Sequence, residues 1–192
     1  MAVAQVELPP AVLPRRRQLL FGSVFAAGAS GMFLATMLGL YLEARSAAGD
    51  TWLSDHIIPL AQPNVILFSL LLSAITAQWA VYAIARDDRG NTYLAIAMTE
   101  MFGLAAVVQT WFLYTQIGLG VDQSEGALFY GVTGGHLAMI IAGLVFFALV
   151  GFRTLGGSYS SAYPDGVSAA ALFWHVTVGL YMVVWLAVYI MK

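Results

Sequence analysis

The most constraining feature of the sequence is the stretch from Leu128 to Phe152, which contains no Asp, Glu, Lys or Arg and a single histidine, His136. An α-helix rises about 1.5 Å per residue, so this stretch, at roughly 37 Å, is long enough to cross a hydrocarbon core of about 30 Å. Gly131 and Gly135 form a GxxxG step, and small residues at this spacing let helices approach closely in lipid. An imidazole beside such glycines is expected to face other helices. The stretch therefore predicts a membrane-spanning helix within a bundle.

The composition agrees with a membrane location. Hydrophobic residues make up 60% of the chain and charged residues 9%, whereas soluble domains carry about 25% charged residues. The formal net charge of −2 gives no reason to expect a nucleic-acid partner. The chain has no cysteine, so disulfides, thiolate nucleophiles and cysteine-bound metal clusters are excluded.

Four further apolar runs predict four further helices, which gives an all-α membrane protein, a bundle of five transmembrane helices. The expected helices cover residues 19–42, 65–85, 92–114, 128–152 and 168–191. Residues 1–18 are expected to form a flexible N-terminal arm, and residues 19–192 a single transmembrane domain. The arginines at 15–17 loosely fit a signal peptide, but the apolar run that follows is far longer than the core of about 7–15 residues that such a peptide has.

The basic residues are distributed unevenly along the chain. Six of the 8 lie in the N-terminal arm, the turn at 86–91 and the loop at 153–167, and the other two are Arg45 and Lys192. Loops rich in Lys and Arg stay in the cytoplasm. The N-terminus is therefore expected inside the cell and the C-terminus outside.

The first expected helix carries a small residue at every fourth position: Ala27, Gly31, Ala35 and Gly39. Such a stripe lets a second helix backbone approach closely. The stripe predicts a tight helix crossing, with Gly31 at its centre.

Three ionisable residues lie inside the expected spans: Glu100, His136 and His175. A charge in the middle of a bilayer costs about 2.5–3.5 kcal/mol on insertion scales, so each is a candidate functional group. The alternative for each is a neutral, hydrogen-bonded side chain that fixes helix packing. The two histidines also suggest a b-type haem with two imidazole ligands, but their expected depths differ by roughly 10 Å, and the two ligand nitrogens of one haem lie about 4 Å apart.

Glu100 and His175 are expected at nearly the same depth, because each lies seven or eight residues from the inner end of a helix that runs outward. Two polar groups at one depth in hydrocarbon have reason to meet. We therefore expect a hydrogen bond between them, either direct or through one water. The alternative is a protonated Glu100 that bonds a backbone carbonyl or Thr99.

Aromatic residues form a stripe on the last expected helix: Trp174, Tyr181, Trp185 and Tyr189. Such a stripe is more often a packing or interfacial surface than a cofactor site. Trp174 is therefore a candidate packing site, together with Gly31, Gly131 and Gly135.

Several motifs, in order, resemble those of the cytochrome c oxidase subunit III family (haem-copper oxidase subunit 3). The stretch FYGVTGGHLAMIIAGLVFF at 129–147 is similar to the family pattern F-Y-x-x-T-G-x-H-x-x-H-V-x-x-G-x-I. FWHV at 173–176, followed by Val184 and Trp185, resembles the closing Y-W-H-F-x-D-x-x-W helix, and YLEARSAAG at 41–49 resembles Y-x-x-A-R-x-x-A-G of short bacterial forms. The neighbourhood of Gln109 resembles a G-Q-x-x-E-W helix. The resemblance covers residues 22–192 and implies a five-helix short form.

The resemblance implies a non-catalytic subunit of a bacterial cytochrome c oxidase in the cell membrane. Such a subunit binds no haem or copper itself, so these cofactors are expected in partner chains. It packs against subunit I, with subunit II as a further partner in the complex, contacts membrane lipids, and supports proton uptake and the stability of the complex.

The chain departs from the family pattern at several polar positions. Gly31 stands where the family has a membrane carboxylate, Met139 replaces the second histidine of the HxxH pair, and Val178 replaces an aspartate. The glutamate expected after Gln109 is missing. Glu100, conversely, matches no family position. Two alternatives therefore stay open: an accessory subunit of a nitric oxide reductase, which is a subunit III-like protein, and a small proton-coupled transporter.

Overall fold

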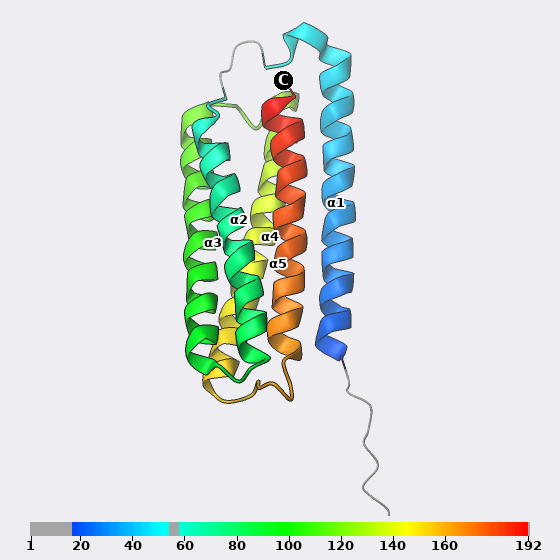
Figure 1. Ribbon diagram of the computed structural model, residues 1–192. Coiled ribbons are helices and arrows are strands. Elements are labelled where there is room, and N and C mark those ends of the chain that lie inside the picture. The colour runs from blue at the N-terminus through cyan, green and yellow to red at the C-terminus, as the bar shows by residue number, and fades with distance from the viewer. Residues whose placement is uncertain (1–16, 54–57, 192) are drawn as a thin grey trace, which may run out of the picture.

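The structure is a computed structural model that describes residues 17–53 and 58–191. It contains five long helices: α1 (Gln18–Ala48), α2 (Ala61–Ile84), α3 (Arg89–Ile117), α4 (Ser124–Leu155) and α5 (Asp165–Val184). A short 3₁₀ turn, η1 (Gly49–Thr51), follows α1, and a π-helical segment, η2 (Trp185–Ile190), extends α5. The expected N-terminal arm falls, apart from residues 17 and 18, outside the described residues. Figure 1 shows the five helices side by side.

All five helices are long and apolar enough to cross a membrane. Consecutive helices run in opposite directions (Figure 1), as short connections in a bundle require. The predicted all-α fold with five transmembrane helices is confirmed, and the protein is an integral membrane protein.

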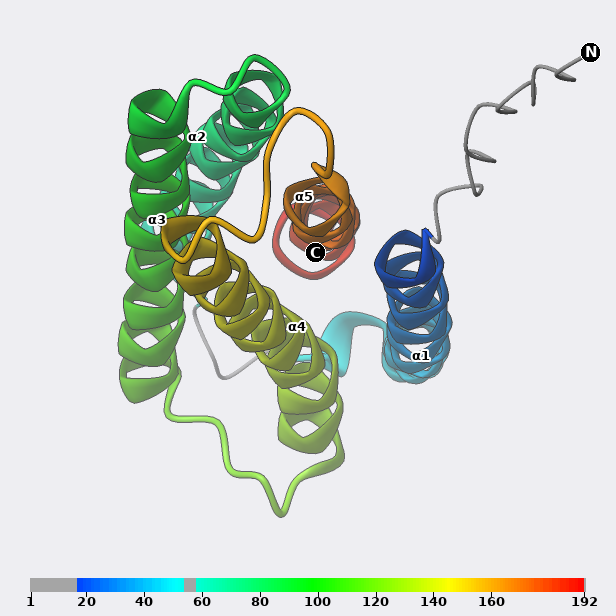
Figure 2. The same ribbon diagram turned by 90° about the horizontal axis from the view of Figure 1, so that it is seen from below.

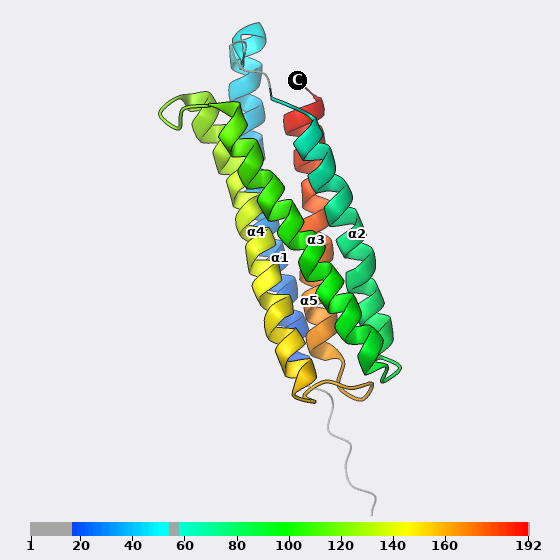
Figure 3. The same cartoon turned by 90° about the vertical axis from the view of Figure 1, so that its left-hand side faces the viewer.

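The five helices form two groups that meet at α5. Seen from below in Figure 2, α2 and α3 pack as a pair, α4 lies against α3, and α1 stands on the far side of α5. Helix α5 contacts α1, α2 and α4. Figure 3 shows from the side how α3 crosses in front of α5. The helix that carries Trp174 and His175 is thus the most enclosed of the five.

The helices extend beyond the apolar runs from which they were expected. Helix α3, for example, begins at Arg89 because Asp88 caps it, its carboxylate accepting a hydrogen bond from the Asn91 backbone N–H at 3.1 Å. It ends where Gly118 adopts a left-handed conformation with φ 64°, which glycine adopts without steric cost. Polar residues at the membrane surface therefore continue the helices by several residues.

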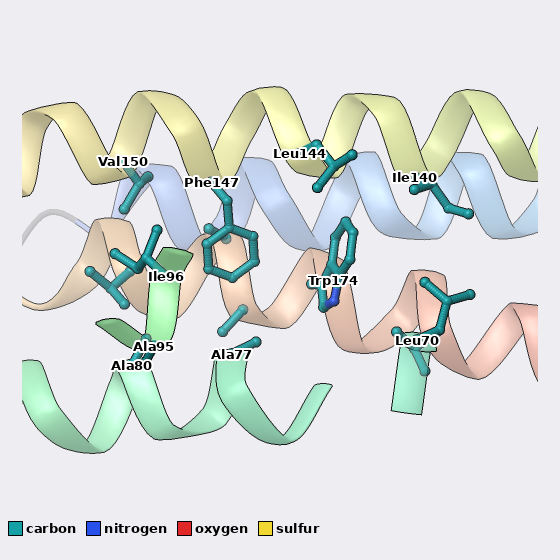
Figure 4. Packing of buried hydrophobic residues seen from close by; sticks show 14 of the residues in the cluster. Leu70, Ala77, Ala80, Ala95, Ile96, Ile140, Leu144, Phe147, Val150 and Trp174 are labelled. Atoms are coloured by element: carbon teal, nitrogen blue, oxygen red, sulfur yellow. The ribbon is translucent and has the colours of Figure 1, made fainter. Parts of the chain in front are cut away.

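The interior consists of two hydrophobic clusters, one toward each end of the bundle. The first surrounds Trp174 and includes Leu70, Leu144 and Phe147 (Figure 4). The second surrounds Phe129 and lies nearer the C-terminal ends of α1 and α5. Four basic residues lie at the opposite end of the bundle, called here the basic end: Arg17, Arg86, Arg89 and Arg153.

Candidate functional site

The centre of the bundle is the indole of Trp174, which is fully buried. Its Nε1–H donates a hydrogen bond to Ser73 Oγ on α2 at 2.8 Å. Its ring meets the Phe147 ring of α4 edge to face, with centroids 5.9 Å apart and an interplanar angle of 89° (Figure 4). One side chain thus joins α5 to α2 and to α4. Buried tryptophans commonly combine a large apolar surface with one satisfied N–H in this way.

Two glycines give the indole its space. A Cβ atom at Gly143 of α4 would lie 2.6 Å from Trp174 Cε3, and one at Gly103 of α3 would lie 2.8 Å from Cη2 and 2.5 Å from Leu144 Cδ2. All three distances are far below ordinary van der Waals contact, which begins near 3.5 Å. Any side chain at either position would therefore collide with the indole. All four helices α2 to α5 meet at this point, which we call the Trp174 centre (Ser73, Gly103, Gly143, Phe147 and Trp174).

Buried hydroxyls extend the Trp174 centre along α2 and α3. Ser73 Oγ also donates to the Leu70 carbonyl at 2.6 Å, so its hydroxyl is both donor and acceptor. One turn along, the hydroxyls of Thr76 and Thr99 lie 2.8 Å apart and join α2 to α3. Interhelical hydrogen bonds of this kind add to packing in a medium where apolar burial alone gives little.

His136 lies in α4 with 2% of its surface exposed. Its Nε2 is 2.9 Å from the Thr177 carbonyl of α5, and because a carbonyl oxygen only accepts, Nε2 carries the proton. The imidazole lies against the Tyr181 ring, with centroids 5.1 Å apart, and the Tyr181 hydroxyl donates to the Pro63 carbonyl at 3.0 Å. His136 therefore tightens the contact between α4 and α5, and Tyr181 links α5 to α2.

His175 faces a different side of α5 from the His136 contact. Its Nδ1 donates to the Ala171 carbonyl of its own helix. His175 precedes Thr177, the residue that His136 contacts, by two positions, which corresponds to about 200° around a helix. The two imidazoles thus point to different sides of α5, in agreement with the argument from depth against a shared haem.

The prediction of a direct hydrogen bond between Glu100 and His175 is wrong. Glu100 Oε1 is buried without a hydrogen-bond partner among the described residues, and His175 bonds its own helix. The reason is the intervening indole: Trp174 fills the space beside Gly103 of α3, and the next residue along α5 points about 100° away from it. Thr99, the alternative partner, bonds Thr76 and Ala95 instead.

The tight crossing expected along the small-residue stripe of α1 is wrong for its second half. Ala27 is buried and Gly31 is partly buried, with a Cβ at Gly31 3.8 Å from Leu180, but Ala35 and Gly39 are exposed. Residues four apart advance about 40° around a helix. A strict four-residue stripe therefore leaves the contact face, and α1 packs with larger residues such as Leu34.

Gly131 and Gly135 of α4 lie under side chains of α1. A Cβ at Gly131 would be 3.7 Å from Met37 Sδ, and one at Gly135 would be 2.9 Å from a Phe33 ring carbon. The Phe33 ring is half exposed, so it has room to move. These glycines thus make room for side chains of α1 that can move. The indole beside Gly143, by contrast, is held between Gly103, Gly143 and Ser73.

At the end of the bundle opposite the basic end, Arg45 lies beside a cavity of about 560 Å³. Its Nη1 donates to the Ala187 carbonyl of η2 at 3.3 Å. Trp52, which also lines the cavity, meets the buried Tyr41 ring edge to face at 5.3 Å. These contacts attach the end of α1 to the end of α5. Tyr41 and Arg45 belong to the family-like stretch at 41–49, but the sequence did not indicate their partners.

At the basic end, Asp87 joins two loops that are 74 residues apart in sequence. Its carboxylate accepts hydrogen bonds from the Ser161 hydroxyl at 2.5 Å and from the Ser161 backbone N–H at 2.7 Å. These bonds, the hydroxyl first, hold the pKa of Asp87 below its ordinary value. The α2–α3 turn is thereby attached to the loop between α4 and α5.

The described residues contain no group of three His, Asp or Glu side chains placed to hold a metal ion. What the geometry does provide is a set of contacts between helices. An indole, two glycines and paired hydroxyls lie at the centre, and the His136 imidazole of α4 bonds α5 at Thr177, one turn beyond Trp174. Ser73 and Gly103 were not expected to take part, because a single serine or glycine in an apolar run carries no signal of its own.

This fold and site define a small all-helical integral membrane protein whose polar groups serve mainly to pack its helices. The chain belongs to the cytochrome c oxidase subunit III family, whose profile matches residues 19–192. The expected family is thereby confirmed.

Individual relatives agree with the family. The chain is 25% identical to the probable cytochrome c oxidase subunit 3 of Mycobacterium leprae over 181 residues, 92% of this chain and 88% of the relative. It is 25% identical to cytochrome c oxidase subunit 3 of Corynebacterium diphtheriae over 186 residues, 91% of each chain. With the subunit of the lancelet Branchiostoma lanceolatum the identity is 32% over 146 residues, 74% of this chain and 54% of the relative.

The chain spans about half the length of the sea urchin and lancelet relatives that it matches, whereas it spans most of the two bacterial ones. The comparisons give no support to a nitric oxide reductase subunit or to a transporter.

Proposed function

We propose that this chain is the non-catalytic membrane subunit III of a cytochrome c oxidase, a haem-copper terminal oxidase of aerobic electron transport. The family match over residues 19–192 carries the proposal. Two bacterial relatives of nearly the same extent have that name. The packing of the bundle is compatible with this role, because most of its buried polar groups are hydrogen-bonded within the chain.

In this role the chain packs in the membrane against the subunits that hold the redox centres, with subunits I and II as the partners and haem and copper bound there. It stabilises the complex and sustains proton uptake by it. Broad apolar surfaces are available for these subunits and for lipid; on α1, for example, Phe25 and Met32 are 76% and 75% exposed.

The proposed location is a bacterial cell membrane, with the basic end of the bundle in the cytoplasm. Arg17, Arg86, Arg89 and Arg153 gather at that end, and the positive-inside rule assigns such an end to the cytoplasm. The C-terminus then lies outside.

Purification of the tagged chain from its native membranes in mild detergent tests the function. We expect haem-bearing subunits to co-purify and the complex to consume oxygen with a reduced cytochrome c as donor. Consumption of nitric oxide in place of oxygen would favour the reductase instead. A chain that purifies without any haem-bearing partner would contradict the proposal.

A further inference from the structure

Glu100 is a carboxylate inside a membrane span that the packing of the described residues leaves without a hydrogen-bond partner. It lies near the middle of α3, is partly exposed, and has a buried Oε1 with no hydrogen-bond partner among the described residues. Buried polar groups in proteins are nearly always hydrogen-bonded. In the hydrocarbon region no water is available to replace the missing partner.

The contact between α3 and α4 has a constant antiparallel register, which shows what lies opposite Glu100. Four contacts share that register: Tyr93 with Thr154, Ile96 with Gly151, Gly103 with Leu144 and Tyr114 with Thr133. Interpolation between them places Glu100 opposite Phe147. The Phe147 ring is fully buried and turned toward Trp174.

Hydrogen bonds join α3 to α4 near both ends of their contact but not in its middle. The Tyr93 hydroxyl donates to the Thr154 carbonyl at 3.3 Å, and the Tyr114 hydroxyl donates to Thr133 Oγ1 at 2.9 Å. Tyr93, Glu100 and Tyr114 are separated by multiples of seven residues, so they share one face of α3. From residue 144 to residue 151, α4 has the sequence LVFFALVG, which offers no side-chain donor to Glu100.

The neighbouring turns of α3 offer no free donor either, because Thr99 bonds Thr76 and Ala95. The residues one turn before and after Glu100 are Ile96, Ala97, Gly103 and Leu104. The side of Glu100 away from the bundle is open, because Ala97 is exposed and Leu104 is 55% exposed. No described residue donates a hydrogen bond to Glu100 Oε1, and the open approach to the residue is across the exposed face of α3.

We infer that the face of α3 around Glu100, formed by Ala97, Glu100 and Leu104, docks a transmembrane helix of another oxidase subunit whose side chain donates a hydrogen bond to Glu100. Acyl chains carry no donor, so lipid alone leaves the carboxylate unpaired. A helix with a hydroxyl, amide or basic side chain supplies the missing group and covers the apolar rim. The inference rests on the proposed function, because it takes the partner from the same complex.

Site-directed photo-crosslinking in the native membrane tests this surface. A photoreactive amino acid replaces Leu104, and the tagged chain is purified after irradiation. We expect a covalent adduct with another oxidase subunit, identified by mass spectrometry. Adducts with lipid alone, or with a second copy of this chain, would overturn the inference.

The role of the carboxylate itself is tested by comparing Glu100→Leu with Glu100→Gln. We expect Glu100→Leu to lower the adduct yield by about fivefold or more, and Glu100→Gln, which keeps an acceptor, to lower it less. Gln109→Leu is the matched control, since residue 109 lies about 180° around α3 from Glu100 and its replacement should leave the yield unchanged. Equal yields for Glu100→Leu and Gln109→Leu would contradict the inference.

Two further measurements separate the possible failures. The purified Glu100→Leu chain should unfold in detergent at the same temperature as the unchanged chain or higher, because an unpaired carboxylate has been removed. A lower temperature would show that Glu100 acts within the chain. If haem-bearing subunits do not co-purify with the unchanged chain, the proposed function fails; if they do and Leu104 yields no subunit adduct, only this inference fails.

Discussion

The confinement of the Trp174 indole predicts that Gly143→Ala destabilises the chain. The new Cβ would lie 2.6 Å from Cε3 and 2.8 Å from Cζ3 of the indole, an overlap of about 1 Å with ordinary contact. The indole cannot move away, because Gly103 leaves no spare room on α3 and Ser73 holds Nε1. Overpacking of this kind costs about 1–3 kcal/mol, and the better helix propensity of alanine returns up to about 1 kcal/mol.

We therefore expect a net loss of about 1–2 kcal/mol in the free energy of unfolding. Unfolding of the purified chain in mixed micelles, as the fraction of denaturing detergent is raised, measures it. Gly179→Ala is the matched control, because a Cβ there meets nothing within 4 Å and the change should be neutral or stabilising. Trp174→Phe should partly rescue Gly143→Ala, since the smaller ring frees the space. Equal stability of the two glycine variants would refute the confinement of the indole.

Three further predictions concern other contacts. Ser73→Ala leaves the buried indole N–H without its acceptor and should cost about 1–3 kcal/mol in the same unfolding assay. Because its pKa is lowered in the folded chain, Asp87 stabilises the loop contact at neutral pH, and this is lost as the pH falls through that lowered pKa. The protection of the Ser161 amide against hydrogen exchange, relative to its intrinsic rate at each pH, should fall there and should be low throughout in Asp87→Asn. A reporter active only outside the cytoplasm should work after Lys192 and fail in the 86–91 turn; the opposite pattern would reverse the orientation.

The number and class of the helices could be predicted because uncharged runs long enough to cross a bilayer have few other folds available. The helices were predicted too short, because the apolar run that identifies each helix covers only part of its length. Helix α1, for instance, continues through Glu43 and Arg45 to Ala48. Polar residues at the membrane surface can be helical and solvated at once, so hydropathy alone does not show that the helix continues through them.

The positions of side chains around each helix were harder to predict than their depths. Counting residues placed Glu100 and His175 at similar depths, but depth carries no information about direction, and the indole of Trp174 separates the two helices. The partners of that indole, Ser73 and Gly103, come from α2 and α3. The arrangement of neighbouring helices depends on contacts between residues about 70 to 100 positions apart. The periodicity of one helix carries no information about these contacts.

The placement of α1 has a consequence for how the protein is made. Helix α1 packs mainly on α4 and α5, which the ribosome produces last, whereas α2 and α3 pair with each other soon after synthesis. At about 5–20 residues per second, α1 waits roughly seven to thirty seconds in the membrane for its partners. A helix that waits alone must be compatible with lipid on every side. This explains why residues 18–42, including the face that is later buried, contain no Asp, Glu, Lys, Arg or His.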